Sequence, residues 1–170
     1  MDVTTTLKKI ADFWAERGFK PEVLYELDGI TYWRIAVDDE HPMFKHPEYV
    51  ALAFEEKLQW HHVVRRRLQP KLYGVKKNGF YADVRDPGGE RAVPLARSRE
   101  MLRRALTDPV TNEGPQIIPL KDRKKIHQVL LKAHRARVER ILFFAAEGFT
   151  ETFPIEEALG TFEFKTEEGK

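Results

Sequence analysis

The chain has 170 residues, of which 42% are hydrophobic and 33% charged, and its formal net charge is +2. This length suits one domain with its own core. Cysteine is absent, which excludes disulfides, thiolate metal ligands and a cysteine nucleophile. No apolar run is long enough to span a membrane and no signal-peptide pattern is present, so we expect a cytoplasmic protein with no membrane partner.

The small net charge hides an uneven distribution. Residues 1–60 carry 7 basic and 12 acidic side chains, residues 61–140 carry 20 and 8, and residues 141–170 carry 2 and 7. A basic middle between acidic ends indicates either a polyanionic partner or contact between oppositely charged parts of neighbouring copies. The alternative is a fold that mixes these charges over its surface.

The N-terminal part predicts a helix that ends at Gly18, followed by two strands at 22–27 and 30–37. Asp28-Gly29 between them favours a type I′ hairpin turn. That turn sets apolar or aromatic residues opposite each other on both faces, in the pairs Leu27 with Ile30, Tyr25 with Tyr32 and Leu24 with Trp33. We therefore expect a hairpin inside a sheet that is covered on both sides.

The loop that follows is rich in side chains that can bind a metal, namely Asp38, Asp39, Glu40, His41 and His46. Carboxylate and imidazole ligands hold divalent cations, and adjacent carboxylates recur in metal-dependent phosphoryl transfer. The spacing matches no motif, and a polar turn with two prolines is the alternative interpretation. A metal-dependent hydrolase that uses this loop is one hypothesis for the function.

Residues 47–69 predict one long helix, opened by Pro47 and stopped by Pro70. Its apolar stripe, which we expect to face the core, consists of Val50, Phe54, Leu58, Val64 and Leu68. The helix ends in Arg65, Arg66 and Arg67, where cations favour the negative end of the helix dipole.

Residues 71–96 predict a three-stranded meander. A turn at Asn78-Gly79 pairs Val75 with Ala82 and Tyr73 with Val84, and gives the sheet a buried face that Val93 and Leu95 extend. The opposite face carries Lys76, Tyr81, Asp83 and Arg85. Pro94 lacks a ladder donor, so we expect the third strand to be an edge strand. A short helix capped by Ser98 then ends at Leu106 and points Arg99, Arg103 and Arg104 outward.

After an extended loop at 107–119, the stretch from Pro119 to Gly148 predicts a second long helix. Ile126, Val129 and Leu130 share one face, and the opposite face carries Lys121, Lys125, Lys132 and Arg135. Arg137 and Arg140 fall inside the apolar stripe, where they require acidic partners, an opening to solvent or an anion bound beneath the helix. The run from Ile141 to Ala146 is apolar all round, which suits an enclosed end or a contact with another copy.

The C-terminal part predicts a strand at 149–153, a short helix at 154–159, a strand at 161–165 and a loose tail at 166–170. The chain as a whole, 1–170, is thus expected to be a single α+β domain. Its antiparallel sheet is built from two hairpin systems that pack against two longer helices, at 47–69 and 120–147.

The sequence leaves three functions open. The first is a non-enzymatic nucleic-acid-binding accessory protein, for DNA or RNA, whose basic surface consists of Arg65, Arg66, Arg67, Lys76, Tyr81, Arg85, Arg99, Arg103, Arg104, Lys121, Lys125, Lys132 and Arg135. The second is a self-assembling structural subunit of a ring or virion, in which the acidic N-terminal block and tail of one copy contact the basic middle of another and Ile141 to Ala146 supply the apolar contact. The third is the hydrolase described above. No phosphate loop, dinucleotide-binding motif or nucleophile elbow is present, so we expect no cofactor and lean away from an enzyme.

Overall fold

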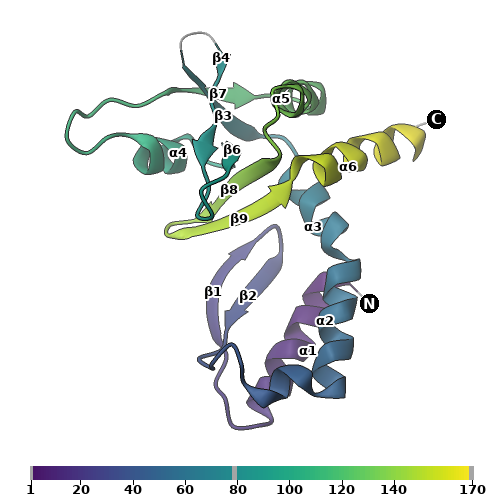
Figure 1. Cartoon of the computed structure of the whole chain (residues 1–170). Helices are drawn as coiled ribbons and strands as arrows, with labels where there is room; N and C mark the ends of the chain where they lie inside the picture. The colour runs from purple at the N-terminus through teal and green to yellow at the C-terminus, as the bar shows by residue number, and fades with distance from the viewer. Residues whose placement is uncertain (1, 78–79, 169–170) are drawn as a thin grey trace. The chain divides into compact units, whose positions relative to one another are not determined.

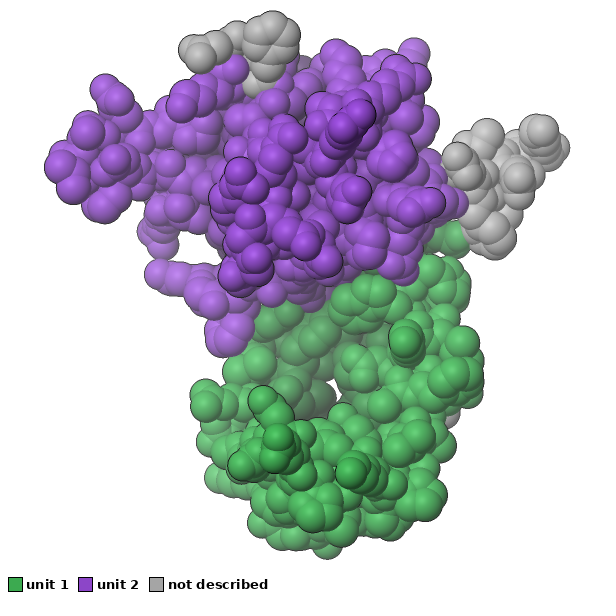
Figure 2. All heavy atoms as spheres, in the orientation of Figure 1, with its two compact units in different colours: residues 1–66 green, residues 67–170 purple. Residues whose placement is uncertain are grey.

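The computed structural model describes the backbone of residues 2–77 and 80–168, and side chains within residues 2–77 and 81–162. These residues form two compact units, 1–66 and 67–170, which Figure 2 shows in different colours. We call them unit 1 and unit 2 and describe each by itself. Helices and antiparallel strands occur in both, which confirms the predicted α+β class (Figure 1). That the chain acts as one domain stays a prediction.

Unit 1 combines helices with one hairpin. Its elements are α1 (Val3–Ala15), β1 (Glu22–Leu27), β2 (Ile30–Arg34), the 3₁₀-helix η1 (Pro42–Lys45), α2 (Pro47–Leu58) and α3 (Trp60–Arg67), whose last residue begins unit 2. Asp2 caps α1 by accepting a hydrogen bond from the Thr5 backbone at 2.8 Å. The core joins α1 to the hairpin and α3 through Val3, Ile30 and Val63.

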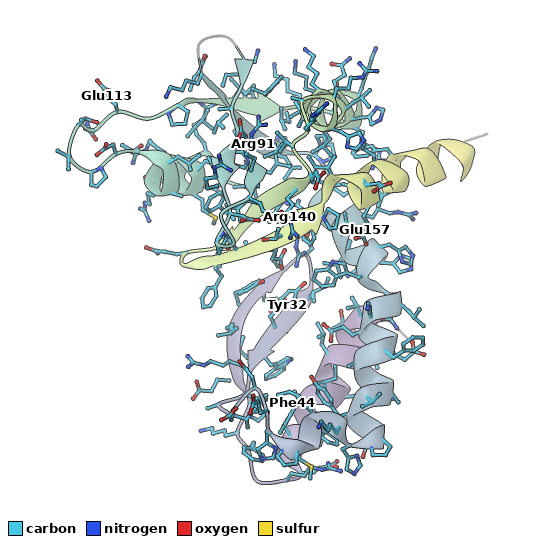
Figure 3. All side chains as sticks on the ribbon, in the orientation of Figure 1. Tyr32, Phe44, Arg91, Glu113, Arg140 and Glu157 are labelled. Carbon is cyan, nitrogen blue, oxygen red and sulfur yellow. The ribbon has the colours of Figure 1, made fainter. Side chains whose placement is uncertain are left out.

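A second cluster in unit 1 is aromatic. Trp14, which is 1% exposed, lies with its ring centroid 5.1 Å from that of Phe44 and 5.8 Å from that of Tyr49. Phe13, the neighbour of Trp14 on α1, contacts the His46 ring with a distance of 5.4 Å between the ring centroids. These edge-to-face contacts fix α1 against η1 and the start of α2, and Figure 3 labels Phe44 within this group.

The predicted helix at 47–69 is broken in the structure. Gln59 ends α2 with φ −97° and ψ 0°, and α3 begins at the next residue. The apolar stripe is divided accordingly: Val64 and Leu68 are buried, whereas Val50, Phe54 and Leu58 of α2 are 51–61% exposed. The expectation that the whole stripe faces the core is therefore wrong for its first half.

The predicted hairpin is present, with Asp28 and Gly29 both at positive φ as a type I′ turn requires. Leu27 pairs with Ile30 and Tyr25 with Tyr32 as expected, but a bulge after Val23 places that residue, and not Leu24, opposite Trp33. The hairpin forms a two-stranded sheet of its own in which only Ile30 is buried. The expectation of a sheet covered on both sides is wrong.

Unit 2 is built on a seven-stranded mixed sheet. Its elements are β3 (Leu72–Lys77), β4 (Phe80–Tyr81), β5 (Val84–Arg85), β6 (Arg91–Ala96), α4 (Arg99–Leu106), β7 (Gln116–Leu120), α5 (Arg123–Arg135), β8 (Arg140–Ala146), β9 (Phe149–Pro154) and α6 (Ile155–Glu168). The strand order is β4-β3-β6-β8-β9, with β7 on β3 and β5 on β6. Helix α4 packs on one face through Leu102, against Val75 and Ala96.

The prediction of a second long helix from Pro119 to Gly148 is correct only for α5 and is wrong beyond Arg135. This stretch contains the end of β7, then α5 and β8, and Arg137 at φ +64° turns the chain after α5. Strand β8 is parallel to β6 and antiparallel to β9, so it lies in the middle of the sheet. Ile141, Leu142 and Phe143 are consecutive and all buried, so both faces of β8 are covered here, which explains why the run is apolar all round. This is the enclosed end, the first of the two alternatives that the sequence left open for this run.

The first hairpin of the meander has the predicted register, in which the Ala82 backbone donates to the Val75 carbonyl at 3.0 Å, but the rest of the meander pairs differently. Lys76 pairs with Tyr81, as a turn at 78–79 implies, although the two turn residues lie outside the described residues. Tyr73, however, pairs with Ala96 and Pro119, and Val84 pairs with Ala92. Strand β6 is therefore internal and not an edge. On its antiparallel side, β6 pairs with β5 up to Ala92 and with β3 again at Ala96. Pro94 lies between these two pairings, where the described ladder requires no backbone N–H donor.

Two further segments differ from the prediction. The loop at 107–119 ends in β7, which pairs along β3, and the strand expected at 161–165 is part of α6. The backbone of α6 continues through residues 166–168 of the predicted loose tail, and 169–170 lie outside the described residues. Among the described residues, no helix combines the length and apolar character that crossing a membrane requires.

Candidate functional site

A cavity of about 310 Å³ lies in unit 2 between the strands and helix α5. We call it the Tyr81 pocket. Its polar lining comes from both sides: Lys76, Tyr81, Asp83 and Arg91 from the strand region, and Lys125 and Lys132 from α5. Its apolar lining includes Val93, Val129 and Val138. The pocket thus brings together four residues of the predicted nucleic-acid surface, Lys76, Tyr81, Lys125 and Lys132.

The strand side of the pocket follows from hairpin register. Lys76 on β3 and Tyr81 on β4 are directly opposite each other, and such pairs project on the same face of a sheet. The Lys76 ammonium lies 4.9 Å from the centroid of the Tyr81 ring, which is a cation–π contact. The neighbouring residue Val75 points to the other face, into the core beneath α4. The sequence predicted this division of the two faces correctly.

The helix side follows from the periodicity of α5. Asp122 caps the helix by accepting a hydrogen bond from the Lys125 backbone at 2.8 Å. Residues 125, 129 and 132 are four and three apart, so they share one side of the helix, and the expectation that Lys125 and Lys132 lie on the face opposite Val129 is wrong. Val129 is buried in this row, and the two lysines stand on either side of it. The Lys125 ammonium reaches 5.6 Å from the Tyr81 ring centroid, which joins α5 to the hairpin.

Asp83 and Arg91 form an ion pair in the wall of the pocket. Arg91 Nε donates to Asp83 Oδ2 at 2.8 Å and Nη2 donates to Oδ1 at 3.4 Å. A third hydrogen bond, from Nη1 to the Ala136 carbonyl at 3.3 Å, ties the guanidinium to the end of α5. The hydrogen bond from Arg91 lowers the pKa of Asp83. Arg91 is labelled in Figure 3.

The pocket has an excess of positive charge. Four cationic side chains and one carboxylate line it, and the carboxylate is already paired with Arg91. Lys76, Lys125 and Lys132 have no ion pair with any residue whose side chain is described. The Tyr81 hydroxyl is buried and has no hydrogen-bond partner among those residues either. Lysine, tyrosine hydroxyl and an aromatic ring face are groups that bind an anion attached to a planar ring.

Arg91 and its partner Asp83 were missed as site residues by the sequence analysis. Val93 was expected on the face of Val75, but it lines the Tyr81 pocket with Lys76. Because side chains alternate along a strand, Arg91 lies on the same face as Val93 and lines the same pocket. The sequence shows that Arg91, Val93 and Leu95 alternate along the strand and so share a face. Which face of the sheet this is depends on the pairing of β6 with β3 and β8.

The other predicted basic residues do not converge on this pocket. Arg67 is 0% exposed and pairs with Glu151, so it belongs to the core and not to a surface. Arg103 and Arg104 both pair with Glu100 on α4, and Arg99 donates to the Ile117 carbonyl at 3.3 Å. Lys121 and Arg135 are exposed near the two ends of α5, and Arg85 donates to the Gly89 carbonyl at 3.2 Å. Arg65 and Arg66 belong to unit 1.

Arg137 and Arg140 do not form an anion pocket. Both lie beyond α5, not inside an apolar helix stripe, and both are exposed. Arg140 on β8 donates from Nε to Glu90 at 2.6 Å and lies 4.0 Å from Asp86, so two acidic side chains neutralise it. Both acids lie in the segment between β5 and β6.

The acidic and histidine loop is structural in unit 1. His41 Nδ1 accepts from the Met43 backbone and His46 Nδ1 from the Glu48 backbone, each at 3.1 Å, so the two imidazoles cap η1 and α2. Asp38 accepts from the Glu40 backbone at 2.9 Å. Among the described residues, no group of three or more His, Asp or Glu side chains is arranged to hold a metal ion. The structure therefore does not support a metal site formed by Asp38, Asp39, Glu40, His41 and His46.

Comparison with known proteins assigns no family. No protein-family model matches the chain, and no curated protein matches it significantly. The functional argument therefore depends on the geometry of the Tyr81 pocket.

Proposed function

We propose that unit 2 binds nucleic acid through the Tyr81 pocket and the cationic residues at its rim, as a non-enzymatic accessory protein. One observation carries this proposal: Lys76 from the hairpin and Lys125 and Lys132 from α5, which are distant in sequence, line one cavity around an aromatic ring. Unit 2 carries 20 basic and 15 acidic residues, whereas unit 1 carries 9 and 12. The proposal includes the cytoplasmic location expected from the sequence.

The physical basis is the phosphate backbone. Each phosphate neutralised by a lysine releases condensed counterions, and this release favours binding at low salt. Ammonium groups that lack a carboxylate partner are the ones available for such contacts, because a paired cation must first lose its own ion pair. Lys76, Lys125 and Lys132 meet this condition among the described side chains, whereas Arg103, Arg104 and Arg140 do not.

The test is the salt dependence of binding to a fluorescent single-stranded 12-mer, measured by anisotropy. We expect the logarithm of the affinity to fall linearly with the logarithm of the salt concentration. In the triple variant Lys76→Gln, Lys125→Gln, Lys132→Gln the slope should fall by about 2, since each phosphate contact on a single strand contributes about 0.7. Affinity at low salt should fall with it.

The matched control is Lys9→Gln, Lys20→Gln, Lys45→Gln, which removes the same charge from exposed positions of unit 1. We expect its slope to equal that of the original protein. A flat salt response of the original protein, or equal slopes for the two triple variants, would overturn the proposed function.

A further inference from the structure

We infer that the Tyr81 pocket holds one unpaired nucleotide of a strand, with its base against the Tyr81 ring and its phosphates on the surrounding lysines. This inference rests on the proposed function and specifies its ligand. It concerns a base that is not in a duplex, whereas the proposed function requires only a polyanion.

The size of the pocket supports a single nucleotide. Its volume of about 310 Å³ is at the lower end of the range for sites that enclose a small molecule, about 300–1,000 Å³. A duplex keeps its base faces stacked on one another, so it offers phosphates to the rim but no base face to Tyr81. An unpaired nucleotide offers both. Base–aromatic stacking is the usual way in which proteins hold single strands, and it tolerates any base.

The charges around Tyr81 support the position of the phosphates. The Lys76 and Lys125 ammonium groups lie 4.9 and 5.6 Å from the ring centroid, one from each side of the pocket. A base stacked on the ring would therefore carry its own phosphates within reach of flexible lysine side chains. Lys132 lies two turns along α5 from Lys125, which extends the row of cations beyond one nucleotide.

The ion pair between Asp83 and Arg91 in the pocket wall sets which end of the nucleotide lies on that side. The Asp83 carboxylate repels phosphate, whereas a base is neutral and has donors and acceptors along its edge. Arg91 makes hydrogen bonds with Asp83 and the Ala136 carbonyl, which fixes the pair in place. The base edge therefore belongs beside Asp83 and Arg91, and the phosphates belong beside the lysines.

The experiment compares three ligands at one salt concentration: a thymidine 12-mer, an abasic 12-mer with the same phosphates, and the duplex of the thymidine strand. We expect the original protein to bind the thymidine strand about 10-fold more tightly than the abasic strand, which is the usual contribution of one stacked base. The variant Tyr81→Leu should lose this preference and bind the abasic strand as before. Tyr81→Phe, which keeps the ring, should retain most of the preference.

The matched control is Tyr25→Leu, which removes an aromatic ring from the hairpin of unit 1, where Tyr25 stacks on Tyr32 at 4.8 Å. It should leave all three affinities unchanged. If the thymidine strand, abasic strand and duplex bound equally, or if Tyr81→Leu kept the preference, the inference would be overturned while nucleic-acid binding stood. If none of the three ligands bound at low salt, the proposed function itself would be overturned.

Discussion

Arg67 and Glu151 form a buried ion pair with two hydrogen bonds, from Nε to Oε1 at 2.7 Å and from Nη2 to Oε2 at 3.2 Å. The Arg67 side chain is 0% exposed and that of Glu151 is 7% exposed. The pair links the first residue of unit 2 to β9, two segments 84 positions apart. Of the three consecutive arginines at 65–67, this one is therefore part of the core.

The pair leads to a prediction about stability. Arg67→Met or Glu151→Gln alone leaves a buried partner without its counter-charge or full hydrogen bonding, and each should lower the free energy of unfolding by about 3–5 kcal/mol. The double variant Arg67→Met, Glu151→Gln removes both charges and should lose less than the sum of the two single changes. Urea denaturation of the four proteins measures this coupling. Additive losses would contradict it.

Phe54 gives a second prediction. It is 61% exposed on α2, so Phe54→Ser should lower the free energy of unfolding by less than about 1 kcal/mol, as for most surface changes. Phe13 of α1 is 1% exposed, and Phe13→Ser should cost about 3–5 kcal/mol, as large-to-small changes in cores do. Chemical denaturation of both variants checks the contrast. A loss for Phe54→Ser similar to that for Phe13→Ser would show that the α2 stripe is covered.

Glu56 predicts a pH dependence. Burial raises the pKa of its carboxyl, so the ionised form is less favourable in the folded chain than in the unfolded one. For a group whose folded pKa is raised, stability is highest at low pH and is lost as the pH rises through the folded pKa. Glu56→Gln should therefore be more stable than the original protein at pH 7, and the difference should vanish below about pH 4.

Thermal unfolding from pH 4 to pH 8 measures the effect of Glu56→Gln. The control is Glu147→Gln, which removes the same charge at an exposed position of unit 2. A stability difference for Glu56→Gln that was constant over this pH range would contradict the assignment of its cause to burial of the charge.

For Asp83 we predict a change in nucleic-acid affinity of the opposite sign to that of the lysine variants. Asp83→Asn removes the one carboxylate of the Tyr81 pocket and releases Arg91 from its ion pair, so binding of a single strand at low salt should become tighter. The salt slope should rise by up to about 0.7, the contribution of one additional phosphate contact. Glu147→Gln changes the net charge equally and should leave the slope unchanged. Anisotropy titrations compare the two, and weaker binding by Asp83→Asn would count against the site.

Some of the fold and part of the candidate site were predictable from local patterns. The Asp28-Gly29 turn, the Ser98 cap and the amphipathic part of α5 are each set by a few neighbouring residues, and all three are present in the structure. For the same reason, the shared face of Lys76 and Tyr81 followed from the hairpin. Helix periodicity placed Lys125 and Lys132 on the face of α5 opposite Val129, whereas in the structure they line one pocket with it.

Tertiary structure alone decided how these pieces meet. The run Ile141–Ala146 fits a buried helix or a central strand equally well, because both are apolar all round, and only pairing with β6 and β9 made it a strand. The same pairing set the face of Arg91, placed it beside Asp83, and left Arg67 in the core with Glu151. Contacts between residues far apart in the chain depend on strand order and register, and local patterns carry no information about either.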